Sequence, residues 1–195
     1  MPFTGHVARK RFGQHWLKDE SVLEEILEAA DIQPDDCVLE VGPGRGVLTE
    51  RLLASQAAAV HAVELDKDLV VGLRQRFNDE SRFSLQEGDV LSVPLTLPDG
   101  SSANKVVANI PYNITGPLLE RLLGRLGRPV ERIYKLLVLL VQKEVADRIL
   151  AKEGQSDFSA LSVRIQLKAK CRSICLVPPS CFQPSPKVHS QVVSI

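Results

Sequence analysis

The feature that most restricts the fold is a short apolar run followed at once by three closely spaced glycines. Cys37–Val41 is typical of a buried strand, Gly42-Pro43-Gly44-Arg45-Gly46 follows it, and a helix is expected from there to about Ser55. Glycines let a backbone approach a ligand closely, and the N-terminus of a helix offers free N–H groups. This order of strand, glycine loop and helix predicts a nucleotide-binding turn.

Strands and helices alternate along the rest of the chain. Further strands are expected over 58–63, 83–86, 105–108, 133–141, 173–177 and 187–195, and helices over 20–30, 66–77, 116–126 and 143–152. Residues 159–168 fit either a strand or a helix. The alternation predicts one α/β domain over 1–195 with a doubly wound, mostly parallel sheet: a basic arm or lid over 1–18 and a Rossmann-like core over 19–195. The last strand stops without a cap, which indicates a fragment of a longer protein.

Composition narrows the class of protein. Hydrophobic residues make up 44% and charged residues 25% of the chain, no apolar run is long enough to span a membrane, and residues 1–18 lack the apolar core of a signal peptide. The four cysteines form no CxxC pair, so we expect reduced thiols rather than a metal site or a disulfide framework. These features predict a cytoplasmic protein without a metal, and they leave an organelle open.

Charge is unevenly distributed although the net charge is zero. Both ends of the chain carry bases and no acids, whereas every acid lies between Asp19 and Asp157. We expect the two ends to form a basic rim beside one cleft for a polyanion, with chance placement on solvated faces as the alternative. The bases are Arg9, Lys10, Arg11 and Lys18 at one end and Arg164, Lys168, Lys170, Arg172 and Lys187 at the other.

A second polar stretch, Asn109-Ile110-Pro111-Tyr112, follows the expected strand over 105–108. Open α/β sheets place their ligands at the carboxyl ends of strands. Asn109 offers one acceptor and two donor hydrogens, Pro111 restricts the backbone, and Tyr112 supplies a flat face. Together they could hold a planar nitrogen base by its exocyclic amine, whereas the plainer interpretation is a turn that begins a helix.

The glycine spacing separates two kinds of cofactor. A dinucleotide fold needs G-x-G-x-x-G, but Val47 stands where its third glycine belongs, and the pattern from Glu40 is E-x-G-x-G-x-G. Glu64 and Asp89 follow two further strands, where they could accept hydrogen bonds from a ribose and from an adenine amine. With no Walker lysine present, S-adenosylmethionine fits these groups better than a dinucleotide.

Taken together, the motifs resemble those of the rRNA adenine dimethyltransferase family, which dimethylates two neighbouring adenines near the 3′ end of small-subunit rRNA. The resemblance covers essentially the whole chain. Its motifs are Arg11-Phe12-Gly13-Gln14-His15, Glu40 to Gly46, Val63-Glu64-Leu65-Asp66, Gly88-Asp89-Val90, Asn109 to Tyr112, Val177-Pro178-Pro179 and Phe182 to Val188.

The resemblance implies a role for individual residues. It implies that Asn109 and the Ile110 carbonyl take the amine hydrogens of the target adenine, next to Pro111, while Tyr112 and Phe182 stack on its ring. It also implies a small-subunit precursor particle as partner, a monomeric enzyme, and a C-terminal helical domain that this chain lacks. The residues implied to bind S-adenosylmethionine are Gln14, His15, Leu17, Gly42, Gly44, Glu64, Asp89 and Asn109.

Three other functions remain open at this point. An antibiotic-resistance methyltransferase of large-subunit rRNA shares the fold and the target motif, although the Phe182–Val188 loop and Gly13-Gln14-His15 favour the small-subunit type. A non-catalytic ribosome-assembly factor could keep the fold, but the intact Asn109 and Tyr112 favour an active enzyme. A dehydrogenase is disfavoured by the glycine spacing.

Overall fold

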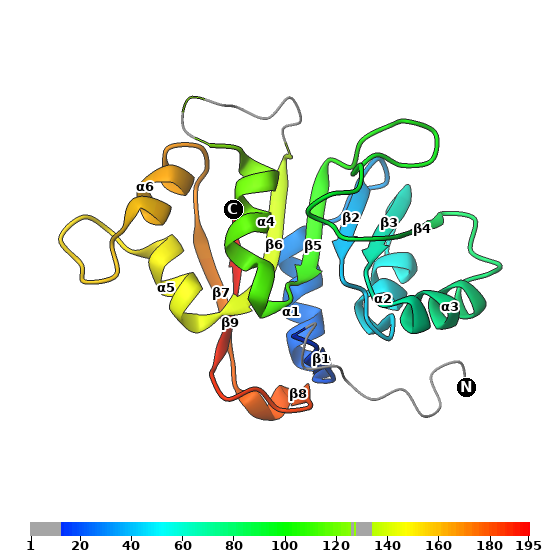
Figure 1. The fold of residues 1–195 in the computed structure, drawn as a ribbon, viewed down its shortest axis with the longest axis horizontal. Coiled ribbons are helices and arrows are strands. Elements are labelled where there is room, and N and C mark those ends of the chain that lie inside the picture. The colour runs from blue at the N-terminus through cyan, green and yellow to red at the C-terminus, as the bar shows by residue number, and fades with distance from the viewer. Residues whose placement is uncertain (1–12, 126, 128–133) are drawn as a thin grey trace.

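The computed structural model of the protein describes residues 13–125, 127 and 134–195. Within this part of the chain a seven-stranded sheet runs through the middle of the molecule, with helices on both faces (Figure 1). Neighbouring strands from β4 to β6 are parallel, whereas β9 is antiparallel to both β6 and β7, so the doubly wound, mostly parallel sheet is confirmed. The strand order is β4 (Phe83–Glu87), β3 (Ala59–Glu64), β2 (Cys37–Val41), β5 (Lys105–Asn109), β6 (Leu136–Gln142), β9 (Ser190–Ser194) and β7 (Arg172–Val177).

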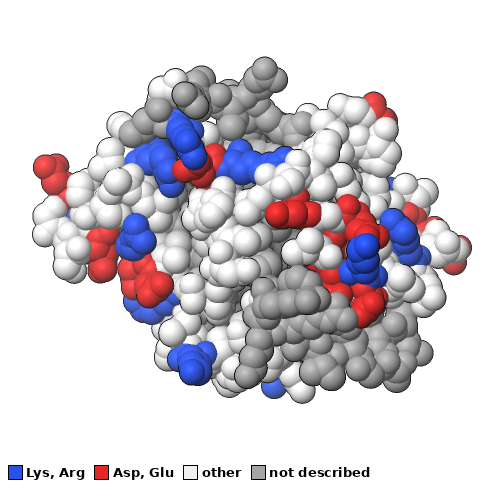
Figure 2. Space-filling view, in the orientation of Figure 1, with Lys and Arg blue, Asp and Glu red and all other residues white. Residues whose placement is uncertain are grey.

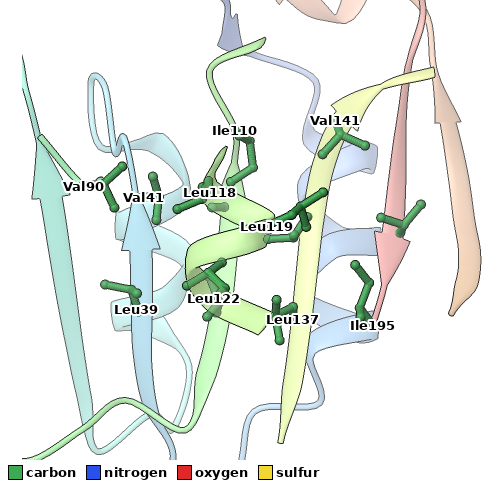
Figure 3. Close-up of a cluster of buried hydrophobic side chains, with 14 of the residues drawn as sticks. Leu39, Val41, Val90, Ile110, Leu118, Leu119, Leu122, Leu137, Val141 and Ile195 are labelled. Atoms are coloured by element: carbon green, nitrogen blue, oxygen red, sulfur yellow. The ribbon is translucent and has the colours of Figure 1, made fainter. Parts of the chain in front are cut away.

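Two hydrophobic clusters fill the space between the sheet and its helices. One face is covered by α1 (Glu20–Ala30) and α2 (Val47–Ala54), and α3 (Lys67–Arg76) lies beside β3 and β4. The other face is covered by α4 (Thr115–Leu123), α5 (Lys143–Leu150) and α6 (Ala160–Gln166). Figure 3 shows how the leucines of α4 pack over strands β2 and β6. None of the helices described is both long enough and apolar enough to cross a bilayer.

The segment 159–168, which fits two patterns, is a helix. Ser159 and Ser162 form a capping box at its start, and Ser162 also donates a hydrogen bond to the Arg148 carbonyl. The alternating apolar residues do not share one face, because Leu161 and Ile165 are buried whereas Leu167 is 69% exposed. The helix cap, and not the alternation of apolar residues, decides the structure here.

Part of the N-terminal segment forms a short strand. Residues 1–12 lie outside the described part of the chain, but Trp16–Leu17 forms β1, which pairs antiparallel with β8 (Phe182–Gln183). The loop expected over 178–186 therefore contains this short strand, preceded by a 3₁₀ turn over Pro179–Cys181. The pairing brings two segments from opposite ends of the chain together below the sheet (Figure 1).

Candidate active site

Four adjacent parallel strands end along one edge of the sheet, and a cavity of about 260 Å³ opens there. Gly42 follows β2, Glu64 ends β3, Asp89 follows β4 and Asn109 ends β5. The cavity thus lies where open α/β sheets bind ligands. Most residues predicted for the site line it: Gln14, His15, Gly42, Gly44, Glu64, Asp89, Asn109, Ile110, Pro111 and Tyr112.

The glycine loop forms one wall of this cavity. Gly42 and Gly44 have φ angles of +64° and +60°, a left-handed conformation that favours glycine. A Cβ atom on Gly44 would lie 2.9 Å from Cδ1 of Trp16, so a side chain here would collide with the indole ring. The loop therefore lets other groups approach its backbone closely, as the sequence predicts.

Glu64 ties the glycine loop to the start of α3. Its carboxylate accepts hydrogen bonds from the Gly44 amide at 3.1 Å and from the Asp66 amide at 2.9 Å. Burial raises the pKa of Glu64, against the opposing effect of these backbone bonds. Because each carboxylate oxygen has a second lone pair, Glu64 can also accept hydrogen bonds from a ligand.

Two further predicted residues, Gln14 and Asp89, line the same cavity as Glu64. Gln14 donates from Nε2 to Oδ2 of Asp66 at 3.0 Å, which holds the N-terminal segment against the α3 cap. Asp89 is exposed in the turn after β4, where its Oδ1 accepts a hydrogen bond from the Leu91 amide at 2.9 Å. The cavity therefore has acidic groups near two of its strand ends.

The amide group of Asn109 is held by the N-terminal segment. Its Nδ2 donates to the His15 carbonyl at 2.9 Å, and the next residue is fixed by a 3.0 Å bond from the Ile110 amide to the Leu140 carbonyl. Pro111, at φ −57°, precedes the 3₁₀ turn over Tyr112–Ile114. Because this bond uses the nitrogen, the oxygen is the part of the Asn109 carboxamide that can accept a hydrogen bond from a ligand.

Tyr112 stands between two residues from distant parts of the sequence. Its ring stacks on the His15 imidazole, with centroids 5.3 Å apart and planes at 27°. His15 is held in turn by a hydrogen bond from Nδ1 to the Pro184 carbonyl at 2.8 Å. On the other side, the Tyr112 hydroxyl lies 2.5 Å from Oγ of Ser190, and burial raises the pKa of the phenol.

Leu17 and Phe182 are placed differently from the other predicted site residues. They face each other across the β1–β8 pair and are only 6% and 2% exposed, within the cluster that α1 and α2 cover. Neither lines the cavity. Their apolar side chains gain more from packing in this cluster than from facing the solvent, and the stacking role expected for Phe182 stays a prediction.

Three bases of the expected basic rim lie away from the candidate site. Lys168, Lys170 and Arg172 line a different cavity of about 800 Å³, next to Leu137 at the start of β6 and Ile195 beyond β9. The glycine loop follows the carboxyl end of β2, and β6 is parallel to β5 and β2, so the start of β6 lies at the opposite edge of the sheet. The end of the antiparallel β9 lies at that same edge. Arg9, Lys10 and Arg11 lie outside the described residues. Figure 2 shows Lys and Arg interspersed with Asp and Glu on the face drawn.

Two contacts in the site were missed by the sequence analysis. Trp16 lines the cavity, and the Arg45 guanidinium lies 3.9 Å from the centroid of its ring. Ser190 meets Tyr112 because the antiparallel β9 begins at the edge where β5 and β6 end. The position of Trp16 in a segment rich in bases was a sequence signal for its contact with Arg45. The contact between Ser190 and Tyr112 could be found only from the topology of the sheet.

Comparisons with known proteins identify the relatives of this chain. Residues 5–195 match the family model described as ribosomal RNA adenine dimethylase. A protein of Synechococcus sp. (strain WH7803), named Ribosomal RNA small subunit methyltransferase A, is 73% identical over all 195 residues, which span 70% of its length. A protein of the same name from Prochlorococcus marinus (strain MIT 9303) is 74% identical over the same share of each chain.

Solved structures share the fold. A dimethyladenosine transferase from Plasmodium falciparum is 34% identical with a TM-score of 0.82, over 92% of this chain and 62% of that one. The 23S rRNA methyltransferase ErmE is 27% identical with a TM-score of 0.78, over 92% of this chain and 68% of its own. The chain therefore spans less than two thirds of the first structure and about 70% of the two sequence relatives.

Proposed function

The chain belongs to the ribosomal RNA adenine dimethylase family, and on this premise we propose that it dimethylates the N6 amines of two adjacent adenines near the 3′ end of small-subunit rRNA. S-adenosylmethionine is the methyl donor. The observation that carries the proposal is the position of Asn109, which lines one cavity together with the glycine loop, Glu64 and Tyr112. That arrangement brings a group suited to an exocyclic amine next to groups suited to an adenosine.

The residues that line the cavity suit the chemistry of the donor. The left-handed Gly42 and Gly44 leave their backbone open to a ligand, and Trp16 closes against the loop so tightly that no side chain fits at Gly44. We assign the ribose hydroxyls to Glu64 and the adenine amine to Asp89. Gln14 and His15 line the same cavity, and they would complete the site from the N-terminal segment.

The chemistry requires little beyond positioning. S-adenosylmethionine supplies a methyl group on a positively charged sulfur, and its leaving group is a neutral thioether. The lone pair of an adenine amine is delocalised into the ring, so the amine is a weak nucleophile. The side-chain oxygen of Asn109 and the Ile110 carbonyl would accept its two hydrogens, favour a tetrahedral nitrogen and align its lone pair with the methyl group.

Tyr112 serves the same step by receiving the base. An adenine in a helical RNA has to leave its stack before it reaches a cavity of this kind, and stacking on an aromatic side chain offsets about 1–3 kcal/mol of that cost. Tyr112 is half-buried in the cavity, and its position is fixed by His15 and Ser190. The base would stack on the part of the ring that His15 leaves open.

The proposed rRNA substrate indicates which particle the protein binds and in which compartment it acts. A small-subunit precursor particle is the partner that follows from this activity, and we place the protein in the cytoplasm as a monomer. The relatives named for the small subunit favour this substrate over large-subunit RNA. The decisive assay offers radiolabelled S-adenosylmethionine with either under-methylated small subunits or large-subunit RNA, and then maps the labelled bases. Label on large-subunit RNA alone would overturn the assignment.

Asn109→Ala tests the role of the carboxamide. We expect methyl transfer to fall by at least about 100-fold, as when one aligned polar group is removed from an active site. Donor binding should weaken far less, and the chain's only tryptophan, Trp16, reports it by fluorescence because it lines the cavity. Asn78→Ala, at an exposed site after α3, is the matched control. Transfer at the normal rate by Asn109→Ala would refute the role.

A further inference from the structure

Ser190 is a hydroxyl residue at the start of a fully buried strand. It begins β9, is 0% exposed, and is followed on the same strand by the fully buried Val192 and Val193. A buried hydroxyl without a partner destabilises a protein, so an apolar side chain would be the simpler choice for packing alone. The partner of Ser190 is the Tyr112 hydroxyl at 2.5 Å, 78 residues away in the sequence.

The strand that carries Ser190 holds it firmly. Ser190 is paired with Gln142 of β6 on one side and with Val177 of β7 on the other. The adjacent Lys143 amide donates to the His189 carbonyl at 2.9 Å, which fixes the entry into β9. Because β9 lies inside the sheet, the hydroxyl of Ser190 is a rigid anchor and not a group on a mobile loop.

The ring of Tyr112 is therefore held at two points. Its hydroxyl is bound to the interior of the sheet through Ser190, while its face rests on His15. A phenol ring can swing about only two side-chain bonds, so an anchor at its far end leaves it little freedom. Without this anchor, stacking on His15 would be the one ring contact left to Tyr112 among the residues that the structure describes, and the ring could turn away from the plane that an incoming base needs.

We infer that Ser190 is a positioning residue for the target base, acting through Tyr112. This inference rests on the proposed function, since it requires Tyr112 to receive an adenine. Ser190 does not line the cavity and touches no reacting atom. Its contribution is to present the ring of Tyr112 in one orientation, so that a stacked adenine brings its amine to Asn109.

A double-mutant cycle tests the inference. Ser190→Ala and Tyr112→Phe remove the same hydrogen bond from its two ends, and both leave the aromatic ring in place. We expect each to lower kcat/KM for the RNA by about threefold to tenfold, the usual effect of one hydrogen bond. The double variant should lose no more than either single variant, while donor affinity, measured by Trp16 fluorescence, stays within about twofold of normal.

Ser194→Ala is the matched control, because Ser194 is a buried serine at the other end of β9, beside the second cavity. It should leave kcat/KM unchanged. Ser190→Ala with normal kcat/KM, or with the same loss in the Tyr112→Phe background as in the unmodified chain, would overturn the inference. A complete lack of methyl transfer by the unmodified chain would instead remove the proposed function, and the inference with it.

Discussion

Replacing Glu40 with glutamine is expected to reduce the loss of stability that the protein shows as the pH rises from about 5 to about 8. Glu40 lies in the middle of β2 and is only 1% exposed. One of its oxygens accepts a hydrogen bond from Oγ1 of Thr49 at 2.7 Å. Burial, against the effect of this bond and with a smaller contribution from the charge of Glu64, raises the pKa of Glu40 to about 8.

The direction of the effect follows from where the proton is held. An unfolded glutamate titrates near 4.5, so between that value and about 8 the folded protein keeps a proton that the unfolded chain releases. Raising the pH through this range therefore favours unfolding. At about 1.4 kcal/mol for each pH unit, the free energy of unfolding falls by roughly 3 kcal/mol by pH 7 and roughly 5 kcal/mol above pH 8.

Urea unfolding at several pH values measures this loss directly. The unmodified chain should show a midpoint that falls as the pH rises, with an unchanged m-value. Glu40→Gln should show a clearly smaller fall, because glutamine has no proton to release and only the raised pKa of Glu64 still acts in the same direction. Glu24→Gln, at an exposed position on α1, should keep the slope of the unmodified chain. If Glu40→Gln kept the full slope, buried Glu40 would not be the group that titrates.

Two other substitutions test the core and the glycine loop. Lys105→Met removes a buried partner of Asp36, whose Oδ2 lies 2.7 Å from Nζ, and should lower the free energy of unfolding by about 3–5 kcal/mol because the carboxylate is left uncompensated. An unchanged urea midpoint would contradict this. Gly44→Ala places a side chain at φ +60° and 2.9 Å from Trp16, and should weaken donor binding by about tenfold or more in a Trp16 fluorescence titration. Normal affinity would show that the loop is not held as tightly as the structure indicates.

Local chemistry made much of the fold predictable. Asp19 caps α1 by accepting hydrogen bonds from two backbone amides of its first turn, and Asp66 caps α3 by accepting one. The glycine loop follows β2 directly, and the polar strand ends meet at one edge because parallel strands end on the same side. These features depend on a few neighbouring residues, so the sequence pattern is sufficient to identify them.

What escaped prediction depends on contacts between distant segments. Phe182 pairs with Leu17 and is buried in the core, a placement that its own motif does not indicate. The helix at 160–166 is decided by a serine cap that alternating apolar residues conceal. Ser190 looks like an ordinary strand residue until the antiparallel direction of β9 brings it to Tyr112. Hydrophobic periodicity and composition do not indicate which segments distant in the sequence come into contact.

The place of β9 in the sheet also bears on how the protein is made. Residues 190–194 are inserted between β6 and β7, both of which precede them in the sequence. During synthesis β6 and β7 are made before β9, the strand that pairs with both of them. Each therefore exposes unpaired backbone N–H and C=O groups until β9 has emerged from the ribosome. Exposed strand edges of this kind pair readily with other chains. We expect nascent or shortened chains that end before residue 190 to aggregate.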